Sequence, residues 1–151
     1  MPANQDYKDL FRILNEENVE YMVVGAHAVI FYTEPRYTKD LDVWINPSTE
    51  NALKVYHALR KFGAPLQDIS VDDFTKHDLV YQIGIAPVRI DVLMGIKGLG
   101  FAEAWKNKIE STYSGEKIFI IGKADLIRSK KATGRAQDLL DVEKLEKQKK
   151  V

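Results

Sequence analysis

The sequence contains no cysteine, which excludes disulfides, thiolate metal sites and cysteine nucleophiles. It also lacks any apolar run near the roughly 18 residues that a membrane span requires. Internal repeats, low-complexity segments and obvious linkers are absent as well, so a single domain over residues 1–151 is expected. A chain without cysteine fits the reducing environment of the cytosol, so we expect a soluble, cytoplasmic protein.

The sequence also has no formal net charge at pH 7. Lys plus Arg and Asp plus Glu both number 22, so the overall field gives no reason to expect tight binding to bulk nucleic acid or to a membrane. Any anion site must therefore be local. The three histidines, His27, His57 and His77, show no short-range spacing typical of a metal site. Because 45% of the residues are hydrophobic, the chain can bury the core of a compact α/β domain.

The first half of the sequence alternates helical and strand patterns. Apolar spacing predicts a helix over residues 6–15 with Asp6 as its cap, and a continuous apolar run predicts a buried strand over 19–26. A short helix over 27–33 and a strand over 41–45 are expected next. Ser48 is a good N-cap for a helix that ends at Gly63. The residues expected on its inward side are Leu53, Tyr56, Leu59 and Phe62.

The second half adds a hairpin and two closing helices. A loop over 64–76 with one helical turn precedes the hairpin strands, 79–85 and 88–94. A helix over 101–109, one further strand over 116–122, and helices over 123–133 and 135–148 complete the chain. The resulting fold class is α/β (α+β), with a mixed β-sheet flanked by helices and two closing C-terminal helices.

Two carboxylates, Asp40 and Asp42, stand one residue apart in the segment RYTKDLDVWINP, whose apolar residues otherwise indicate a buried strand. Side chains two positions apart leave a strand on the same face, so the two charges are expected to lie together. They repel by about 1 kcal/mol at close range even in bulk water. A compensating cation is therefore expected, and Arg36 and Lys39 are nearby in sequence.

A third carboxylate, Asp91, interrupts the apolar segment VRIDVLM, where an unpaired charge is costly to bury. Three carboxylates on neighbouring strands suit Mg²⁺ (or Mn²⁺), which prefers carboxylates plus a substrate phosphate to an all-protein cage. Asp40, Asp42 and Asp91 are therefore candidate metal ligands. The alternative is structural: Asp-x-Asp can be a solvated strand end, and Asp91 can pair with Arg89 or Lys39.

Together, the segments VGAHAVIFYTEPRYTKDLDVWI and VRIDVL resemble the nucleotidyltransferase superfamily, whose fold is shared with the palm of DNA polymerase beta. In that family a strand ends in Gly-Ser or Gly-Gly, a short helix follows, the next strand carries Asp-x-Asp, and a later strand carries a third Asp. The matching positions are Gly25, Asp40, Asp42 and Asp91. The form Arg-x-Thr-x-Asp-x-Asp, which begins at Arg36, resembles the abortive-infection and toxin-type branch, often called AbiEii-like.

The C-terminal segment LIRSKKATGRAQDLLDVEKL resembles the Lys-x-x-Ala…Arg-x-x-Asp helix pair of the same branch. Lys130, Arg135 and Asp138 stand at the matching places. Helical spacing puts Lys130 on the face of Leu126 and Ile127, which extends the inward stripe of its helix. A lysine there either snorkels to solvent or faces an anion, and the triphosphate is the candidate anion.

The resemblance implies a metal-dependent nucleotidyltransferase that moves NMP from an NTP to a hydroxyl acceptor. Its catalytic residues would be Asp40, Asp42, Asp91 and Lys130. The acids would hold Mg²⁺ against the triphosphate, Asp91 would help to activate the hydroxyl, and Lys130 or Arg36 would offset charge on the leaving group. The residues expected to bind substrate are Gly25, Ala26, Arg36, Thr38, Lys39, Arg135 and Asp138.

One position departs from the family pattern. Ala26 stands where Ser or Gly usually follows the first glycine, so a hydroxyl that often contacts the terminal phosphate is missing. The backbone N–H groups after Gly25 would still meet phosphates at a helix N-terminus. The departure favours one alternative function, a catalytically weak or inactive nucleotide-binding or partner-regulating module. A structural interaction protein, whose acids pair with Arg36, Arg89 and Lys130, is the other.

The acceptor and the partners follow only coarsely from the sequence. RNA, a protein and a small molecule all remain possible acceptors. The expected partners are the NTP substrate and, through the resemblance, a protein from a two-gene toxin-antitoxin or defence module. No membrane partner is expected.

Overall fold

The computed structural model describes residues 4–38, 40–85 and 88–147. The helices in these ranges are α1 (Gln5–Glu16), α2 (Gly25–Tyr32), α3 (Thr49–Phe62), the 3₁₀ helix η1 (Val71–Thr75), α4 (Phe101–Trp105), α5 (Lys123–Thr133) and α6 (Ala136–Lys147). The strands are β1 (Tyr21–Val24), β2 (Asp40–Ile45), β3 (Val80–Ile85), β4 (Val88–Leu93), β5 (Ile109–Tyr113) and β6 (Glu116–Ile120).

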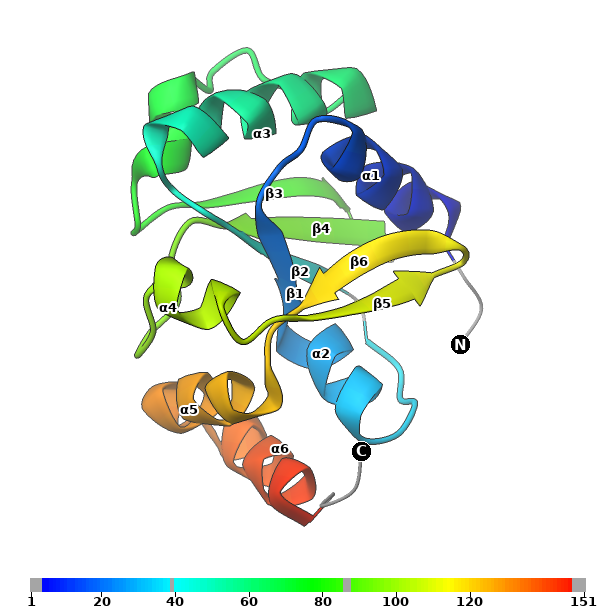
Figure 1. The fold of residues 1–151 in the computed structure, drawn as a ribbon, viewed down its shortest axis with the longest axis vertical. Coiled ribbons are helices and arrows are strands. Elements are labelled where there is room, and N and C mark those ends of the chain that lie inside the picture. The colour runs from blue at the N-terminus through cyan, green and yellow to red at the C-terminus, as the bar shows by residue number, and fades with distance from the viewer. Residues whose placement is uncertain (1–3, 39, 86–87, 148–151) are drawn as a thin grey trace.

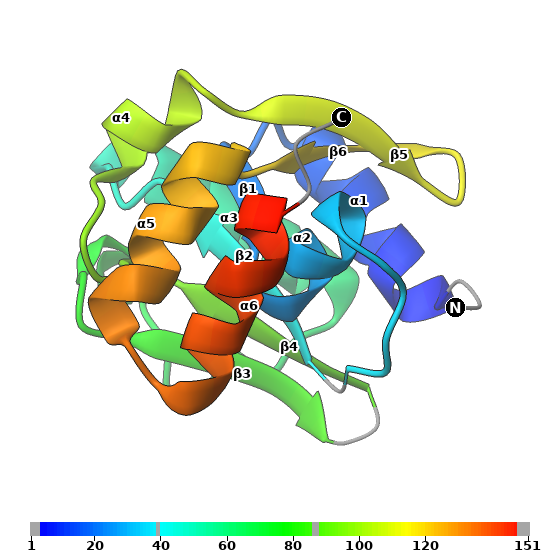
Figure 2. The same ribbon diagram turned by 90° about the horizontal axis from the view of Figure 1, so that it is seen from below.

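The strands form one mixed sheet in the order β3-β4-β2-β1-β6-β5. Strand β1 runs parallel to β6, and β2 runs parallel to β4, while the other neighbours are antiparallel. Helices α1 and α3 lie together on one side of the sheet, and α5 and α6 lie together on the other (Figure 1). Seen from below, α2, α5 and α6 stand in front of the central strands (Figure 2). The predicted mixed sheet with two closing helices is confirmed.

Helix α1 covers the sheet with a stripe at helical spacing. Tyr7, Leu10, Phe11 and Leu14 are all buried, and the Phe11 ring stacks on Tyr21 of β1 at 6.1 Å. The prediction that Asp6 caps this helix is wrong. The side chain of Asn4 is the cap, because it accepts the backbone N–H groups of Asp6 and Tyr7.

The central strands are apolar except at one end of β2. All four residues of β1 are buried, as are Leu41, Val43 and Ile45 of β2. Trp44 is buried on the other face of β2, where it packs edge-on against Phe101 at 5.1 Å. Asp40 and Asp42 share that face and remain half-buried, so the acidic end of β2 borders the core without entering it.

Three sequence-based expectations about the elements are wrong. The helix expected to reach Ile109 ends at Trp105, and Ile109 begins β5, a strand that was not expected. Helix α2 begins at Gly25 instead of His27, which shortens the preceding strand. Leu53 of α3 is 49% exposed, whereas Leu59 is buried as predicted, together with Val55 and two alanines.

The unexpected hairpin has a clear local cause. Ser114 and Gly115 connect β5 to β6 with positive φ angles of 50° and 88°, the conformation that two-residue hairpin turns require. Glycine adopts it without steric cost. In the segment IESTYSGEKIFI, the alternating burial on both sides of Ser-Gly follows the period of a hairpin.

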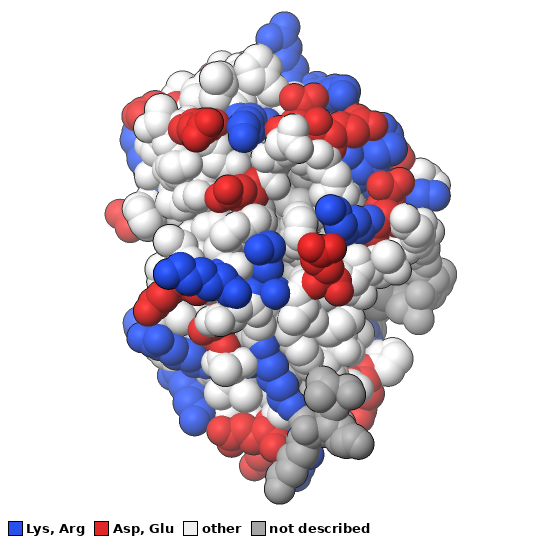
Figure 3. Space-filling view, viewed as in Figure 1, with Lys and Arg blue, Asp and Glu red and all other residues white. Residues whose placement is uncertain are grey.

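The surface reflects the balanced composition. On the face seen in Figure 3, basic and acidic side chains are interspersed over most of the surface. Within the described part of the chain, no helix is both long and apolar enough to span a bilayer.

Candidate active site

The strands β2 and β4 place four charged side chains in one cluster. In their parallel register Asp40 lies opposite Arg89, and Asp42 lies opposite Asp91. Because residues two apart share a face, all four side chains project from the same side of the sheet. We call Asp40, Asp42, Arg89 and Asp91 the β2–β4 cluster. The predicted placement of Asp40 and Asp42 on one face, with Asp91 beside them, is confirmed.

The surroundings of Asp42 and Asp91 disfavour the ionised form of both carboxyl groups. Burial, followed by repulsion from Asp91 and Asp40, raises the pKa of Asp42 to about 7. Burial also raises the pKa of Asp91, and the charge of Arg89 opposes that rise. The two carboxyl groups are hydrogen-bonded to each other, while Oδ1 of Asp91 is buried without a hydrogen-bond partner. The pair therefore has unused ligand capacity for a cation.

Arg89 supplies the compensating charge that the sequence suggested would come from Arg36 or Lys39. Its Nη2 lies 2.9 Å from Oδ2 of Asp40, and its Nε lies 3.5 Å from Oδ1 of Asp91. Arg36 instead binds Asp141 of α6 at 2.7 Å. Lys39 lies outside the described residues.

Gly25 brings the start of α2 against Asp42. Its φ is +68°, and a Cβ built there would collide with Oδ2 of the Asp42 carboxylate. Only glycine tolerates both the left-handed conformation and this approach. Among the described residues no side chain caps the N-terminus of α2, so its first backbone N–H groups remain available beside the acidic pair.

The C-terminal helices carry a buried ionic network. Asp138 is 2% exposed and Asp141 fully buried, and both contact Lys130, at 3.4 and 3.3 Å. Asp138 also accepts hydrogen bonds from the Thr133 hydroxyl at 2.6 Å and from Nε of Arg135 at 2.8 Å. We call Arg36, Lys130, Thr133, Arg135, Asp138 and Asp141 the α5–α6 network. Lys130 neither snorkels freely nor points alone at an anion, because two acids hold it.

The hydrogen bonds in this network outweigh burial in setting the charge of the two acids. Burial by itself would raise the pKa of Asp138, yet hydrogen bonds from Arg135 and Thr133 and the charge of Lys130 hold it well below its usual range. The pKa of Asp141 is lowered in the same way, since Arg36, Gln137 and Lys130 oppose the effect of burial. Both acids are therefore ionised at neutral pH.

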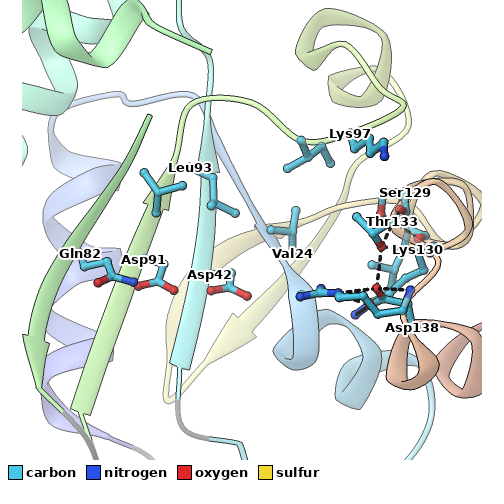
Figure 4. A pocket seen from close by; sticks show the side chains of 15 residues that line it. Val24, Asp42, Gln82, Asp91, Leu93, Lys97, Ser129, Lys130, Thr133 and Asp138 are labelled. Atoms are coloured by element: carbon cyan, nitrogen blue, oxygen red, sulfur yellow. Dashed lines mark hydrogen bonds and ion pairs between the residues drawn. The ribbon is translucent and has the colours of Figure 1, made fainter. Parts of the chain in front are cut away.

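A cleft of about 440 Å³ separates the sheet from α5 and α6. Asp42 and Asp91 lie on the sheet side, while Lys130, Thr133 and Asp138 lie on the helix side (Figure 4). The side chains that line it are Val24, Gly25, Asp42, Val80, Gln82, Asp91, Leu93, Ile96, Lys97, Leu126, Ser129, Lys130, Thr133, Arg135 and Asp138. The sheet wall thus carries two acids, while the opposite wall carries cations, hydroxyls and Asp138.

The structure gathers part of the predicted site in this cleft. Those that line it are Gly25, Asp42, Asp91, Lys130, Arg135 and Asp138. Asp40 is in the β2–β4 cluster but is turned to Arg89. Ala26, Arg36 and Thr38 are not among the described residues that line this cleft, and their role in substrate binding stays a prediction.

Sequence reasoning missed several lining residues. Gln82 of β3 lies opposite Asp91 and donates a hydrogen bond to it. Lys97 comes from the GIKGLG loop and makes no ion pair with any described residue, while Ser129 comes from the same helix as Lys130. Asp141, which contacts Lys130 from outside this lining, is the residue for which a sequence signal existed, because it follows Asp138 by three positions on the same helix face.

The carboxylates fit a divalent cation in part. Asp42 and Asp91 are neighbours across the strands, Oδ1 of Asp91 accepts no hydrogen bond from the described residues, and hard carboxylate oxygens are what Mg²⁺ or Mn²⁺ prefers. Among residues 4–38, 40–85 and 88–147, however, no three His, Asp or Glu side chains are already arranged for a metal ion. Asp40 could complete the set only by leaving Arg89.

Comparison with solved structures identifies the fold. A Thermotoga maritima protein assigned as a nucleotidyltransferase has a TM-score of 0.63 at 15% identity, over 95% of this chain and 91% of the other. The lincosamide antibiotic adenylyltransferase LnuA, solved with lincomycin bound, has a TM-score of 0.60 at 13% identity, over 95% of this chain and 96% of the other. The antibiotic-resistance factor ANT(2'')-Ia has a TM-score of 0.64 at 11% identity, over 93% of this chain and 80% of the other.

No protein-family model matches the sequence, and no curated protein matches it significantly. The likeness to the three structures therefore rests on coordinates, and at such identities it establishes the fold alone. This chain has the fold of the nucleotidyltransferases.

Proposed function

We propose that this protein is a nucleotidyltransferase that moves NMP from an NTP to a hydroxyl acceptor, with Mg²⁺ or Mn²⁺ bound at Asp42 and Asp91 and joined by Asp40. The observation that carries the proposal is the close approach of Gly25 to the Asp42–Asp91 pair at the edge of a cleft. The shared fold supports the reaction class, and the adjacent, half-buried acids support the site.

The reaction exchanges one phosphorus–oxygen bond for another. The acceptor oxygen bonds to the α-phosphorus, the bond from that phosphorus to the bridging oxygen breaks, and pyrophosphate leaves. Asp91 is the candidate to receive the proton of the acceptor hydroxyl, because burial already raises its pKa and thus its affinity for a proton. When bound, the cation would neutralise phosphate charge and help to orient the reacting oxygens.

In this proposal, groups on both sides of the cleft bind the phosphates. The first backbone N–H groups of α2 lie beside the acidic pair and favour a negative charge. Across the cleft, Lys97 and Arg135 can approach the leaving pyrophosphate, and Lys130 adds positive charge from within its network. We also propose that Thr38 and Lys39 contribute to substrate binding through the loop before β2.

We extend the proposal to the biological setting that the sequence motif suggests. The Arg-x-Thr-x-Asp-x-Asp segment resembles the toxin-type branch, which supports a role in a toxin-antitoxin or defence module with a partner protein. Because LnuA and ANT(2'')-Ia are antibiotic-modifying or antibiotic-resistance proteins, small hydroxyl compounds such as lincomycin belong in the acceptor panel beside RNA and the partner protein.

Two observations favour the second candidate, a nucleotide-binding or partner-regulating module with weak or no turnover. Ala26 supplies no hydroxyl in the first turn of α2. Asp40 is also engaged by Arg89. Such a protein would bind NTP with Mg²⁺ and release no pyrophosphate with any acceptor.

The test is transfer of label from each of the four α-³²P NTPs to the acceptor panel, with pyrophosphate release measured in parallel. Asp42→Asn and Asp91→Asn should abolish both signals while the fold persists. Asp72→Asn is the matched control, because the Asp72 side chain is 77% exposed on η1 and lies outside the cleft. Unchanged transfer by the two cleft variants would refute the proposed site, and nucleotide binding without pyrophosphate release would favour the second candidate.

A further inference from the structure

Arg89 contacts two of the three carboxylates that the proposed cation site would use. Its guanidinium reaches Asp40 on the neighbouring strand and Asp91 two residues along its own strand. In the β2–β4 cluster it is the only described cation within ion-pair distance of the acids. Two of the three acids are therefore directed to an internal positive charge.

The contacts of Arg89 allow its guanidinium to move away from Asp40 and Asp91. The contact with Asp40 is short, at 2.9 Å, but Nε faces Asp91 at 3.5 Å and makes no hydrogen bond there. The Arg89 side chain is 35% exposed, and Asp40 is 30% exposed, so solvent can take up the guanidinium once it moves. Arg36 differs in this respect, because its partner Asp141 is fully buried.

A guanidinium cannot give up its charge to make room for a metal ion. Arginine stays protonated at any pH the fold survives, so a divalent cation at the same carboxylates must displace it or accept its repulsion. Phosphate oxygens offer a displaced guanidinium a bidentate partner of the right geometry. Nucleotide phosphates at the cleft edge would therefore favour the displacement.

Resting on the proposed function, we propose that Arg89 is a positioning residue that competes with the divalent cation for Asp40 and Asp91. The free protein then binds the cation weakly. Tight binding requires a nucleotide, whose phosphates receive Arg89 as Asp40 turns toward Asp42. Cation and nucleotide thus bind cooperatively, and a bare metal ion does not occupy the site at low concentration.

The test is Mn²⁺ binding without nucleotide, followed through the electron paramagnetic resonance signal of free Mn²⁺. Arg89→Met removes the charge and keeps a long side chain, so the variant should bind Mn²⁺ at least about tenfold more tightly than the wild type. Arg89→Lys keeps the charge and should stay near the wild type. Arg12→Met, which breaks an exposed pair on α1, should change nothing.

Repeating the titration with a non-hydrolysable NTP separates this inference from the proposed function. The nucleotide should strengthen Mn²⁺ binding in the wild type far more than in Arg89→Met, because only the wild type must move Arg89. Equal or weaker Mn²⁺ binding by a folded Arg89→Met would overturn the inference alone. Failure of every protein to bind Mn²⁺, with or without nucleotide, would overturn both proposals.

A measurement on the wild type covers the case in which Arg89→Met does not fold. The side-chain Nε–H signal of Arg89, assigned through Arg89→Lys, should stay in place when Mg²⁺ alone is added and shift when Mg²⁺ and the nucleotide analogue are added together. A shift of equal size with Mg²⁺ alone, or no shift with both, would contradict competition between Arg89 and the cation.

Discussion

At the scale of single residues, the site depends on a glycine that touches a carboxylate. Gly25 follows β1 and begins α2 with φ +68°, and the space of its absent Cβ is filled by the Asp42 carboxylate. The sequence pointed to Gly25 through the resemblance alone. The physical reason, a close approach of backbone to an acid, became visible only with the register of β1 and β2, which pairs Val24 with Asp42.

Gly25→Ala should therefore be more harmful than an ordinary glycine substitution. The left-handed conformation alone costs a non-glycine residue about 1 kcal/mol, and the collision with Asp42 should add to that cost. Gly134→Ala is the matched control, because Gly134 has φ +63° and its Cβ would meet nothing closer than 3.6 Å. Urea unfolding should show a larger loss for Gly25→Ala, and equal losses would argue against the close approach.

Asp42→Asn should leave the protein at least as stable as the wild type at pH 8. The substitution removes one of two adjacent, largely buried negative charges and keeps the size of the side chain. A rise in melting temperature together with loss of nucleotide transfer would mark Asp42 as a functional acid that costs stability. A fall of several degrees would instead indicate that Asp42 stabilises the fold.

At the scale of elements, the two closing helices are attached by charge as well as by apolar packing. Arg36 from the loop before β2 and Lys130 from α5 both bind Asp141 of α6. The sequence predicted both helices and singled out Lys130, Arg135 and Asp138. It could not predict that these groups bind one another, because the contact between α5 and α6 depends on the turn at Gly134.

Asp141→Ala should destabilise the protein by about 3 kcal/mol, because it removes the buried partner of Arg36 and one of the two buried acids that contact Lys130. Glu146→Ala is the control on the same helix. Glu146 is 53% exposed and pairs with an exposed Lys131, so its loss should cost less than about 1 kcal/mol. Similar urea midpoints for the two variants would show that the network contributes little.

The same network predicts a specific acid sensitivity. The pKa values of Asp138 and Asp141 are lowered in the folded protein, so their contribution to stability is fully present above the unfolded value near about 4 and declines as the pH falls below it. Asp138→Asn should reduce this decline. Urea midpoints between about pH 6 and pH 3 test the prediction, and parallel curves for the variant and the wild type would contradict it.

At the scale of the whole molecule, sequence periodicity predicted which helices and strands form better than it predicted which of them lie side by side. The buried runs of β1, β2 and β4 and the helices α1, α3, α5 and α6 all followed from apolar spacing and caps. Strand β5 was missed because its residues alternate only weakly in polarity, and the Ser-Gly turn was not used as a signal. Local patterns thus carried most of the architecture.

The sequence predicted the acids Asp42 and Asp91 and the cations Lys130 and Arg135 of the cleft, but it did not predict which cation contacts Asp40. Asp42 and Asp91 lie two and one strands from the β3 edge, yet the parallel register places them side by side, as a common metal role would require. The partner of Asp40 was the open question, and the nearby Arg36 proved to bind elsewhere. Arg89 could not be preferred from sequence, because the contact depends on which residues of β2 and β4 lie opposite each other.

The most direct test of the central claim is the melting temperature of the wild type and Asp42→Asn with each NTP, with and without Mg²⁺. A ligand that binds only the native state raises this temperature. The account predicts that at least one NTP stabilises the wild type only when Mg²⁺ is present and that Asp42→Asn shows no Mg²⁺-dependent shift. Equal shifts in both proteins, or no shift in the wild type with any NTP, would contradict it.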